Sequence, residues 1–372
     1  MSFLPFTRFG PAKKVFVVVV VVVVTFAYWE VGVRYLAKTA FPLLRTDPEV
    51  GSIHVKNYSG YAWDVESARK NFIRTNSLGY VGEDVAVAKP TSTLRIAMLG
   101  DSTLAGLQVD YTKNFVSLLQ DELSATPFCG KNKFEVMNFG VGSAGTFIEY
   151  QIYAKKVVPY HPDYVFIVFH DDYADNIAKA NYSLEHYSEE RRSVGLKGFL
   201  LQFELPKLIF SKLKNNEVLL SVLRHIGFFE TTAPAAMSSV VATTSPTAST
   251  STDKYYTYTF QVMDRLTTLI KENGSIPVVL ILPYEHDLAA AGKWKENTST
   301  AAMVAYLDHT GIASINPADE MAAMKAARGG GCLSFGCGDH LNEAGHEVMA
   351  ALLYRDMQTR LPANKALCPA PK

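Results

Sequence analysis

The sequence lacks an excess of charge of either sign. Its 36 lysine and arginine residues are matched by 36 aspartate and glutamate residues, so the formal net charge is zero. A protein that binds nucleic acid needs a surplus of basic residues to neutralise phosphates, and a strongly anionic partner makes the same demand. We therefore expect no nucleic-acid partner.

Cysteine is also scarce. The 372 residues include four cysteines and no Cys-x-x-Cys pair, which argues against a zinc site. We expect neither a metal nor an organic cofactor. Cys332 and Cys337 are five residues apart and are spaced to close a small loop, although four cysteines allow three full pairings. This number fits an oxidising compartment without requiring one.

One long apolar run is present near the N-terminus, in KKVFVVVVVVVVTFAYW. It predicts a transmembrane signal anchor over residues 15–33. Because Arg8, Lys13 and Lys14 precede the run, residues 1–14 are expected in the cytoplasm and the rest of the chain in the periplasm or another extracytoplasmic space. A cleaved secretory signal peptide is the alternative, but the small-x-small cleavage pattern is poor.

The rest of the chain has two different patterns. Residues 34–93 are polar and rich in turn signals, which predicts a juxtamembrane stalk or an N-terminal wrap on the next domain. Short apolar runs of strand composition then alternate with segments of helical periodicity, and this alternation predicts a domain over residues 94–364. The expected strands are 94–99, 134–139, 163–169, 276–282 and 312–316, and the expected helices include 114–123, 146–158, 258–273 and 300–311.

This alternation predicts the α/β class. Near-continuous apolar strands separated by helices are typical of a parallel sheet that is covered on both faces. We expect a doubly wound, flavodoxin-like three-layer sandwich with a five-stranded parallel sheet, in addition to the N-terminal transmembrane helix.

A long insertion separates the third and fourth predicted strands. Residues 180–254 exceed the usual length of a crossover connection. Residues 198–229 are apolar with interspersed lysines and predict two short helices, which form either a helical layer on the domain or a lid or interfacial helix. Residues 231–253 are rich in Ser, Thr, Ala and Pro and are expected to be mobile.

A candidate nucleophile stands where the first strand of this domain ends. Gly-Asp-Ser at residues 100–102 runs from that strand into a segment of helical character. Open α/β sheets bind their ligands at the carboxyl ends of their strands. Ser102 would have its own backbone N–H and the helix dipole to favour negative charge on a reacting oxygen. A plain turn capped by Asp101 or Ser102 is the alternative.

Such a serine needs a base, and His340 is the best candidate. It precedes a C-terminal helix for which Asn342 is a good N-cap, so it is expected near the same edge of the sheet. His346, in the first turn of that helix, is expected to serve packing or capping. For His170 and His286, which follow the third and fourth predicted strands, a structural or surface role is the better expectation.

Four segments together resemble the SGNH (GDSL-type) hydrolases in order and spacing. They are LGDSTLAGLQVDYTKNFVSLLQDEL, VMNFGVGSAGT, HPDYVFIVFHDDYADN and DHLNEAGH. The preceding TNSLGYVGED is similar to a segment found ahead of the first motif in membrane-anchored bacterial members. The resemblance covers residues 75–357 apart from the insertion. It implies hydrolysis of ester bonds without a cofactor, and it does not specify the substrate.

The resemblance implies roles for individual residues. Ser102 corresponds to the nucleophile and to one oxyanion donor, and His340 corresponds to the general base. The second donor in the family is the backbone N–H of a glycine, and the aligned position here is Ser143, next to Gly142. The third donor in the family is an asparagine side chain, and Asp171 stands in its place, with Asn176 as a less favoured substitute.

Two departures from the family pattern bear on catalysis. An ionised Asp171 is acceptor-only and would repel an oxyanion. The family's triad acid stands two or three residues before the histidine, where this chain has Gly338 and Cys337. Asp339 is the only local carboxylate and is the candidate acid, and otherwise the site is a Ser-His dyad or uses Asp319 or a backbone carbonyl to orient the ring.

Together these features predict an extracytoplasmic serine ester hydrolase that acts on acyl esters of a glycan, a lipid or a small molecule. De-O-acetylation or O-acyl transfer on envelope glycans is the specific expectation. The alternative, motivated by Asp171 and the missing triad acid, is a catalytically degenerate SGNH domain that serves as an envelope binding or scaffold protein.

Overall fold

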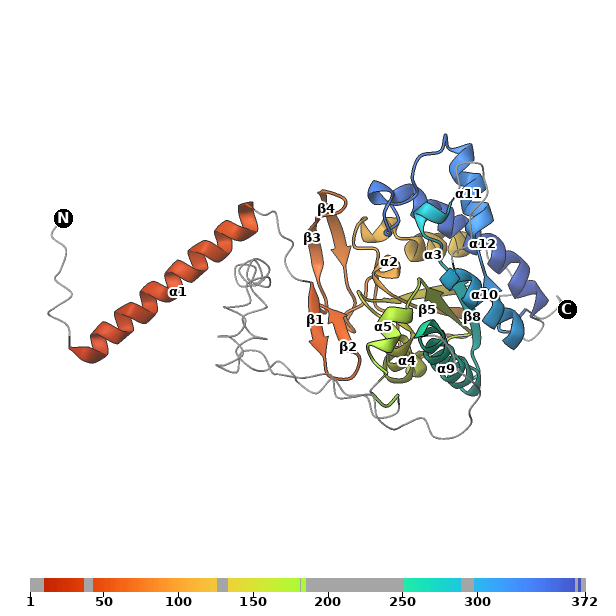
Figure 1. Ribbon diagram of the computed structural model, residues 1–372, viewed down its shortest axis with the longest axis horizontal. Coiled ribbons are helices and arrows are strands. Elements are labelled where there is room, and N and C mark those ends of the chain that lie inside the picture. The colour runs from red at the N-terminus through yellow and green to blue at the C-terminus, as the bar shows by residue number, and fades with distance from the viewer. Residues whose placement is uncertain are drawn as a thin grey trace. The chain divides into compact units, whose positions relative to one another are not determined.

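The computed structural model describes residues 10–36, 43–125, 133–180, 182–184, 251–288, 298–364 and 367–368 (Figure 1). The predicted helices of residues 198–229 lie outside the described residues, and so does nearly all of the predicted mobile stretch. The chain divides into two units, of which one holds residues 1–42 and 191–246 and the other holds residues 43–190 and 247–372.

Helix α1, Pro11–Leu36, is the part of the first unit with a described structure. Residues Pro11–Val33 are long and apolar enough to cross a membrane, and 6% of the most apolar window is buried. A signal sequence near an N-terminus has the same properties. The helix contains the predicted span of residues 15–33 and extends beyond it at both ends.

The second unit is built on a five-stranded parallel sheet with the order β6-β5-β7-β8-β9, which confirms the predicted fold class. The strands are β5, Thr93–Gly100; β6, Lys133–Gly140; β7, Tyr164–Phe169; β8, Ile276–Ile281; and β9, Ser314–Ile315. All residues of β5 and β7 are buried, because helices cover both faces of the sheet.

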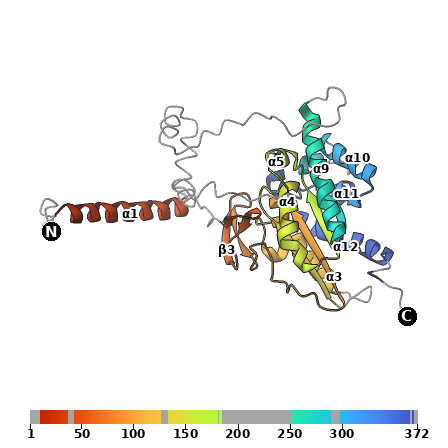
Figure 2. The same cartoon turned by 90° about the horizontal axis from the view of Figure 1, so that it is seen from below.

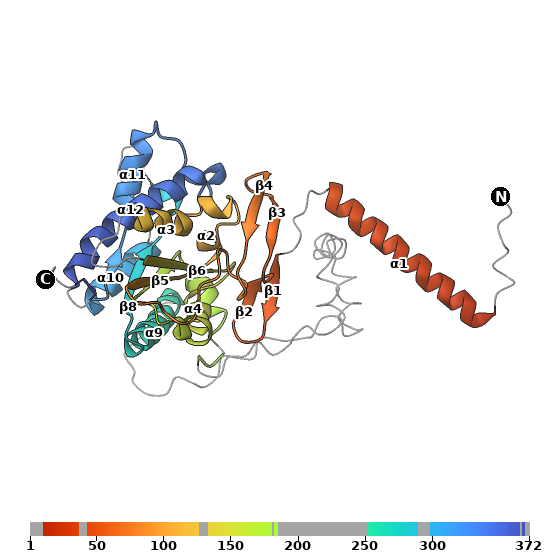
Figure 3. The ribbon, with the colours of Figure 1, turned by 180° about the vertical axis from the view of Figure 1, so that it is seen from behind.

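Alternate residues of each strand enter separate apolar clusters. Val165 and Ile167 face the cluster of α4, α9 and α10, whereas Phe166 and Val168 face that of α3, α11 and α12. Figure 2 shows α4 and α9 side by side, and Figure 3 shows α3, α11 and α12 on the other side of the sheet. The helices are α3, Phe115–Ala125; α4, Thr146–Ile152; α9, Ser251–Glu272; α10, Thr298–Thr310; α11, Ala318–Ala327; and α12, Glu343–Ala363.

The helices depart from the prediction at three places. The helix predicted over residues 146–158 ends as α4 at Ile152 and continues as a π-turn, Tyr153–Val157. Helix α9 begins at Ser251, so the last residues of the predicted mobile stretch are helical. Helix α11 was not predicted, because its alanine-rich sequence has almost no apolar face.

Residues 43–93 lead into β5 and belong to the same unit as the sheet. They form two β-hairpins and then a connecting segment, residues 75–92, which we call the strap. The first hairpin pairs β1, Leu44–Asp47, with β2, Gly51–His54, and the second pairs β3, Ser59–Asp64, with β4, Arg69–Arg74. Tyr80 of the strap is fully buried, with its ring 5.0 Å from that of Phe139 in β6. This segment therefore contributes to the core of the domain.

A buried arginine ties the strap to the start of the sheet. Arg95 of β5 has no exposed surface and pairs with Glu135 at 2.6 Å. Its guanidinium also donates to the carbonyls of Ala86 and Val87 at 2.6 and 3.0 Å. These charge-assisted bonds fix residues 86–88 against the amino ends of the strands.

Candidate active site

Ser102 lies where β5 gives way to helix α2, Ser102–Ala105, at the carboxyl edge of the sheet. Asp101 is the N-cap, and its Oδ1 accepts a hydrogen bond from the Thr103 N–H at 2.8 Å. Two glycines allow α2 to approach the strands. A Cβ on Gly140 would lie 2.4 Å from the Ala105 nitrogen, and one on Gly100 would lie 2.9 Å from the Leu104 side chain.

His340 belongs to a loop that is braced on several sides. Its carbonyl accepts a bond from the Phe335 N–H at 2.9 Å, and a disulfide joins Cys332 to Cys337. Asn342, the N-cap of α12, accepts a bond from the Gly345 N–H at 3.0 Å. The Asn342 amide also donates to the carbonyls of Cys332 and Ser334, at 2.7 and 3.2 Å.

The structure brings Ser102 and His340 together, 238 residues apart in the chain. The Ser102 Oγ lies 2.8 Å from the His340 Nε2. Both residues are half-buried, so the pair can be reached by a solute. A hydroxyl at this distance donates a hydrogen bond to the imidazole nitrogen when that nitrogen carries no proton.

The other ring nitrogen of His340 faces a residue that the sequence analysis missed. The Nδ1 lies 2.6 Å from the Oε2 of Glu66, in the turn between β3 and β4. Asp339, the expected acid, is exposed to solvent. Asp319, the other carboxylate considered, is exposed in the first turn of α11. In the structure the His340 ring is thus oriented toward the hairpin, and the role expected for Asp339 stays a prediction.

The loop that follows β6 lies beside Ser102. A Cβ on Gly142 would come within 4.0 Å of the Ser102 Cβ. Ser143 has φ +61°, the left-handed region that glycine adopts without strain. Ser143 thus has a backbone conformation that is uncommon for a residue with a side chain.

Asp171 is the second residue after the strand β7, next to His170, and it is half-buried with φ +56°. The alternative donor, Asn176, is fully buried and its side chain is engaged elsewhere. Its Oδ1 accepts a bond from the Phe147 N–H at 2.8 Å, and its Nδ2 donates to the Thr259 hydroxyl at 3.0 Å. Asn176 therefore joins α5, Tyr173–Ile177, to α4 and α9.

Asp101 is paired beneath the serine with a second histidine. Burial raises the pKa of Asp101, but the hydrogen bond and charge of His170 and the Thr103 N–H together lower the pKa below its usual value. The His170 Nδ1 lies 3.5 Å from the Asp101 Oδ2 and 3.3 Å from the Thr103 hydroxyl. The role of His170 is thus to support the turn that carries Ser102.

Two further carboxyl groups are buried near this turn. Burial raises the pKa of Glu149 well above its usual range, and the charge of Asp101 adds to the rise. Burial does the same for Asp172, where Glu149 and Asp101 contribute. Burial therefore favours the protonated form of both carboxyl groups. Among the residues that the structure describes, no group of three or more His, Cys, Asp and Glu side chains is arranged to hold a metal ion.

Of the other described histidines, His346 is buried and His286 lies at the surface. The His346 Nδ1 accepts a bond from the Phe115 N–H at 3.2 Å, and its ring stacks on that of Phe115. Burial lowers the pKa of His346 to about 3. His286 is exposed and stacks on Tyr284.

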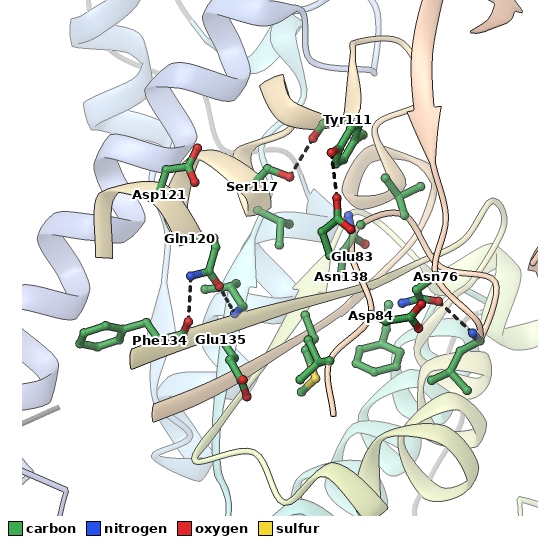
Figure 4. Close-up of a pocket in the computed structure, with 18 of the residues that line it drawn as sticks. Asn76, Glu83, Asp84, Tyr111, Ser117, Gln120, Asp121, Phe134, Glu135 and Asn138 are labelled. Carbon is green, nitrogen blue, oxygen red and sulfur yellow. Dashed lines mark hydrogen bonds between the residues drawn. The ribbon is translucent and has the colours of Figure 1, made fainter. Parts of the chain in front are cut away.

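A cavity of about 370 Å³ lies away from the Ser102 turn, between the strap, α3 and the edge strand β6. Figure 4 shows Gln120 bridging to the backbone of β6 across this cavity, and Glu83 bonded to the Tyr111 hydroxyl. Neither Ser102 nor His340 is among the residues that line it.

No protein-family model matches the sequence, and no match was found among curated proteins. Solved structures do resemble this one. One is the lipase/acylhydrolase from Enterococcus faecalis, with 15% sequence identity and a TM-score of 0.39 over 72% of this chain and 96% of that chain. Another is the acetyl xylan esterase AlAXEase, with 12% sequence identity and a TM-score of 0.40 over 71% of this chain and 99% of that chain. A third is a protein from Desulfitobacterium hafniense DCB-2 placed in the G-D-S-L family of lipolytic proteins, with 12% sequence identity and a TM-score of 0.37 over 70% of this chain and 98% of that chain. The G-D-S-L family named for this third protein is the family that the four sequence motifs resemble.

Proposed function

We propose that this chain is a serine esterase of the SGNH type. The observation that carries the proposal is the 2.8 Å contact between the Ser102 Oγ and the His340 Nε2. It lies at the carboxyl edge of a parallel sheet, where such folds bind their ligands. A serine hydroxyl becomes a nucleophile when a base stands within hydrogen-bond distance, and this pair meets that condition.

In the proposed reaction, the Ser102 Oγ attacks the ester carbonyl while the His340 Nε2 takes the hydroxyl proton. The tetrahedral intermediate collapses to an acyl-Ser102, and His340 gives the proton to the leaving alkoxide. Water or a sugar hydroxyl then loses a proton to His340 and attacks the acyl group. His340 returns that proton to the Ser102 Oγ as the bond between Ser102 and the acyl group breaks. The backbone N–H groups of Ser102 and Ser143, with Gly142 allowing close approach, hold the oxyanion.

Asp171 occupies the third position around the oxyanion. A carboxylate accepts hydrogen bonds and donates none, so Asp171 weakens the stabilisation of negative charge on the reacting oxygen. The proposal therefore includes a modest rate of hydrolysis with water as acceptor, supported by two backbone donors.

The proposed location is extracytoplasmic. Helix α1 serves as an uncleaved signal anchor with residues 1–14 in the cytoplasm, since basic residues precede the apolar run. The Cys332–Cys337 disulfide supports this location, because disulfides form and persist in oxidising compartments. In the periplasm the substrates are acyl esters, and we favour acetyl groups on envelope glycans, removed by hydrolysis or passed to another hydroxyl.

Asp171 also favours a second candidate, an envelope binding protein with a degenerate site. A domain that holds an acyl glycan without hydrolysing it has no need of an oxyanion donor at that position. The aligned Ser102 and His340 argue for the enzyme, because binding alone requires no hydrogen bond between a hydroxyl and an imidazole.

Hydrolysis of p-nitrophenyl acetate and longer-chain esters tests the proposal. The protein to use is the fragment of residues 43–372, which begins where the unit that contains the sheet begins. Wild type is expected to hydrolyse the acetate ester, and Ser102→Ala is expected to abolish the reaction. Asp171→Asn supplies a donor and is expected to raise kcat by about ten-fold or more.

A serine-reactive phosphonate gives an independent measurement. Labelling of Ser102 that disappears in His340→Ala supports an activated serine and excludes the degenerate domain. If wild type neither hydrolyses these esters nor reacts with the phosphonate, the esterase proposal is wrong and the binding protein is favoured.

A further inference from the structure

The turn between β3 and β4 presents a carboxylate to the imidazole of His340. The Glu66 Oε2 lies 2.6 Å from the His340 Nδ1, a distance typical of a charge-assisted hydrogen bond. The two side chains retain 32% and 25% of their surface. The contact therefore lies at the rim of the site and not in the core.

Glu66 also lies beside position 338, where this chain has glycine. Gly338 stands two residues before His340, where related hydrolases have their acid. A Cβ on Gly338 would lie 3.6 Å from the Glu66 Oε1. A carboxylate from a remote hairpin thus occupies the region next to the histidine where a side chain at position 338 would extend.

The turn itself is ordered by its own residues. The Asp64 Oδ1 accepts a bond from the Ser67 N–H at 2.7 Å, and Ala68 has φ +51°. Asp64 and Arg69 form the last pair of the β3–β4 register, so Glu66 is at the tip of a four-residue connection. Its position is therefore determined by the hairpin.

The hairpin is fixed to the elements that carry His340 and Ser102. Arg69 pairs with Glu343 in the first turn of α12 at 2.6 Å, and its guanidinium lies 5.8 Å from the Phe335 ring in the His340 loop. Asn71 donates to the carbonyl of Leu107, two residues after the end of α2, at 3.1 Å. Because these contacts join the hairpin to both elements, they fix the position of Glu66 relative to His340.

We infer that Glu66 is the positioning acid of the catalytic site, contributed by the N-terminal hairpin. The inference rests on the proposed function. Glu66 accepts the Nδ1–H of His340 and thereby fixes the tautomer in which Nε2 is free to take the Ser102 proton. When the imidazole becomes charged, the carboxylate stabilises it without itself taking the proton.

The test compares Glu66→Gln, Glu66→Asp and wild type in the full chain, with p-nitrophenyl acetate as substrate. Glu66→Gln keeps the size of the side chain and removes its charge. We expect kcat to fall by about 10- to 100-fold, less than for a fully buried triad acid because Glu66 is one-third exposed, with KM changed by less than about three-fold. Glu66→Asp is expected to retain an intermediate kcat.

Two controls separate positioning from folding. Glu83→Gln changes a carboxylate of the same N-terminal segment, whose partners are Arg74 and the Tyr111 hydroxyl, and it is expected to leave kcat unchanged. The melting temperature of Glu66→Gln is expected to match wild type. Placing the acid at the other position, in Glu66→Gln combined with Gly338→Asp, is expected to restore part of kcat.

A spectroscopic signature tests the contact without reference to activity. A ring N–H bonded to a carboxylate gives a strongly downfield proton resonance, which wild type should show and Glu66→Gln should lack. If Ser102-dependent hydrolysis is present and Glu66→Gln has wild-type kcat, or Asp339→Asn loses kcat instead, the inference is overturned while the esterase stands. If wild type has no Ser102-dependent reaction, the esterase proposal fails, and the resonance still decides the contact.

Discussion

At the scale of the residue, the buried carboxyl group of Glu149 makes the free energy of unfolding depend on pH. Its side chain is fully buried, and among the described residues neither carboxyl oxygen has a hydrogen-bond partner. Burial raises its pKa, so the folded protein keeps a proton that the unfolded chain releases once the pH rises above about 4.5. Folding is then coupled to the binding of a proton. The contribution of this group to the free energy of unfolding is therefore largest at low pH and decreases as the pH rises.

Glu149→Gln removes this dependence. Relative to wild type, the variant is expected to gain unfolding free energy as the pH rises above 4.5, with a slope approaching about 1.4 kcal/mol per pH unit. Chemical denaturation of both proteins between pH 4 and pH 8 measures the difference. A difference that stays constant over this range would contradict a protonated Glu149 in the folded state.

At the scale of the element, the start of α12 holds the loop of His340. The Asn342 side chain caps the helix through its Oδ1 and holds two loop carbonyls through its Nδ2. One residue thus links the stability of the helix to the placement of the His340 loop.

Substitutions at this position should separate the two tasks. Asn342→Ala is expected to lower the unfolding free energy by about 1–2 kcal/mol and also to lower kcat. Asn342→Ser keeps a cap oxygen but supplies no amide to the loop, so most of the stability should return while kcat stays low. Thermal melts with ester kinetics on the same samples provide the measurement, and a parallel recovery of both would argue against the loop role.

At the scale of the whole molecule, the hairpins and strap are part of the domain core. Val50, Ile53 and Tyr80 are at most 5% exposed and pack in the same cluster as α4 and α9. Burial of each such side chain is worth about 1.5–3 kcal/mol. Without these three side chains, the domain would lose a large part of the free energy of unfolding that a typical domain has.

A fragment of residues 94–372 is therefore expected to lose cooperative folding, whereas residues 43–372 should retain it. Near-ultraviolet circular dichroism with thermal melting compares the two. Equal melting temperatures would show that residues 43–93 are dispensable, contrary to their burial.

The sheet and the Ser-His pair could be predicted because their signals are local. β7, with its six buried residues, is a continuous apolar run, and Gly-Asp-Ser marks the turn after β5. β3 and β4 mix polar and apolar residues because they are half-exposed, so no clear period identifies them. Glu66 meets His340 only through tertiary structure, and no feature of the residues around Glu66 indicates that contact.

The chain order of the site has a consequence for biosynthesis. Glu66 and Ser102 leave the ribosome early, but the last helix, α12, follows His340 by only two residues and packs against α3. Domains fold as units once enough of the chain has emerged. A nascent chain therefore holds Ser102 without His340 until 238 further residues have been added, and the proposed nucleophile has no base during that time.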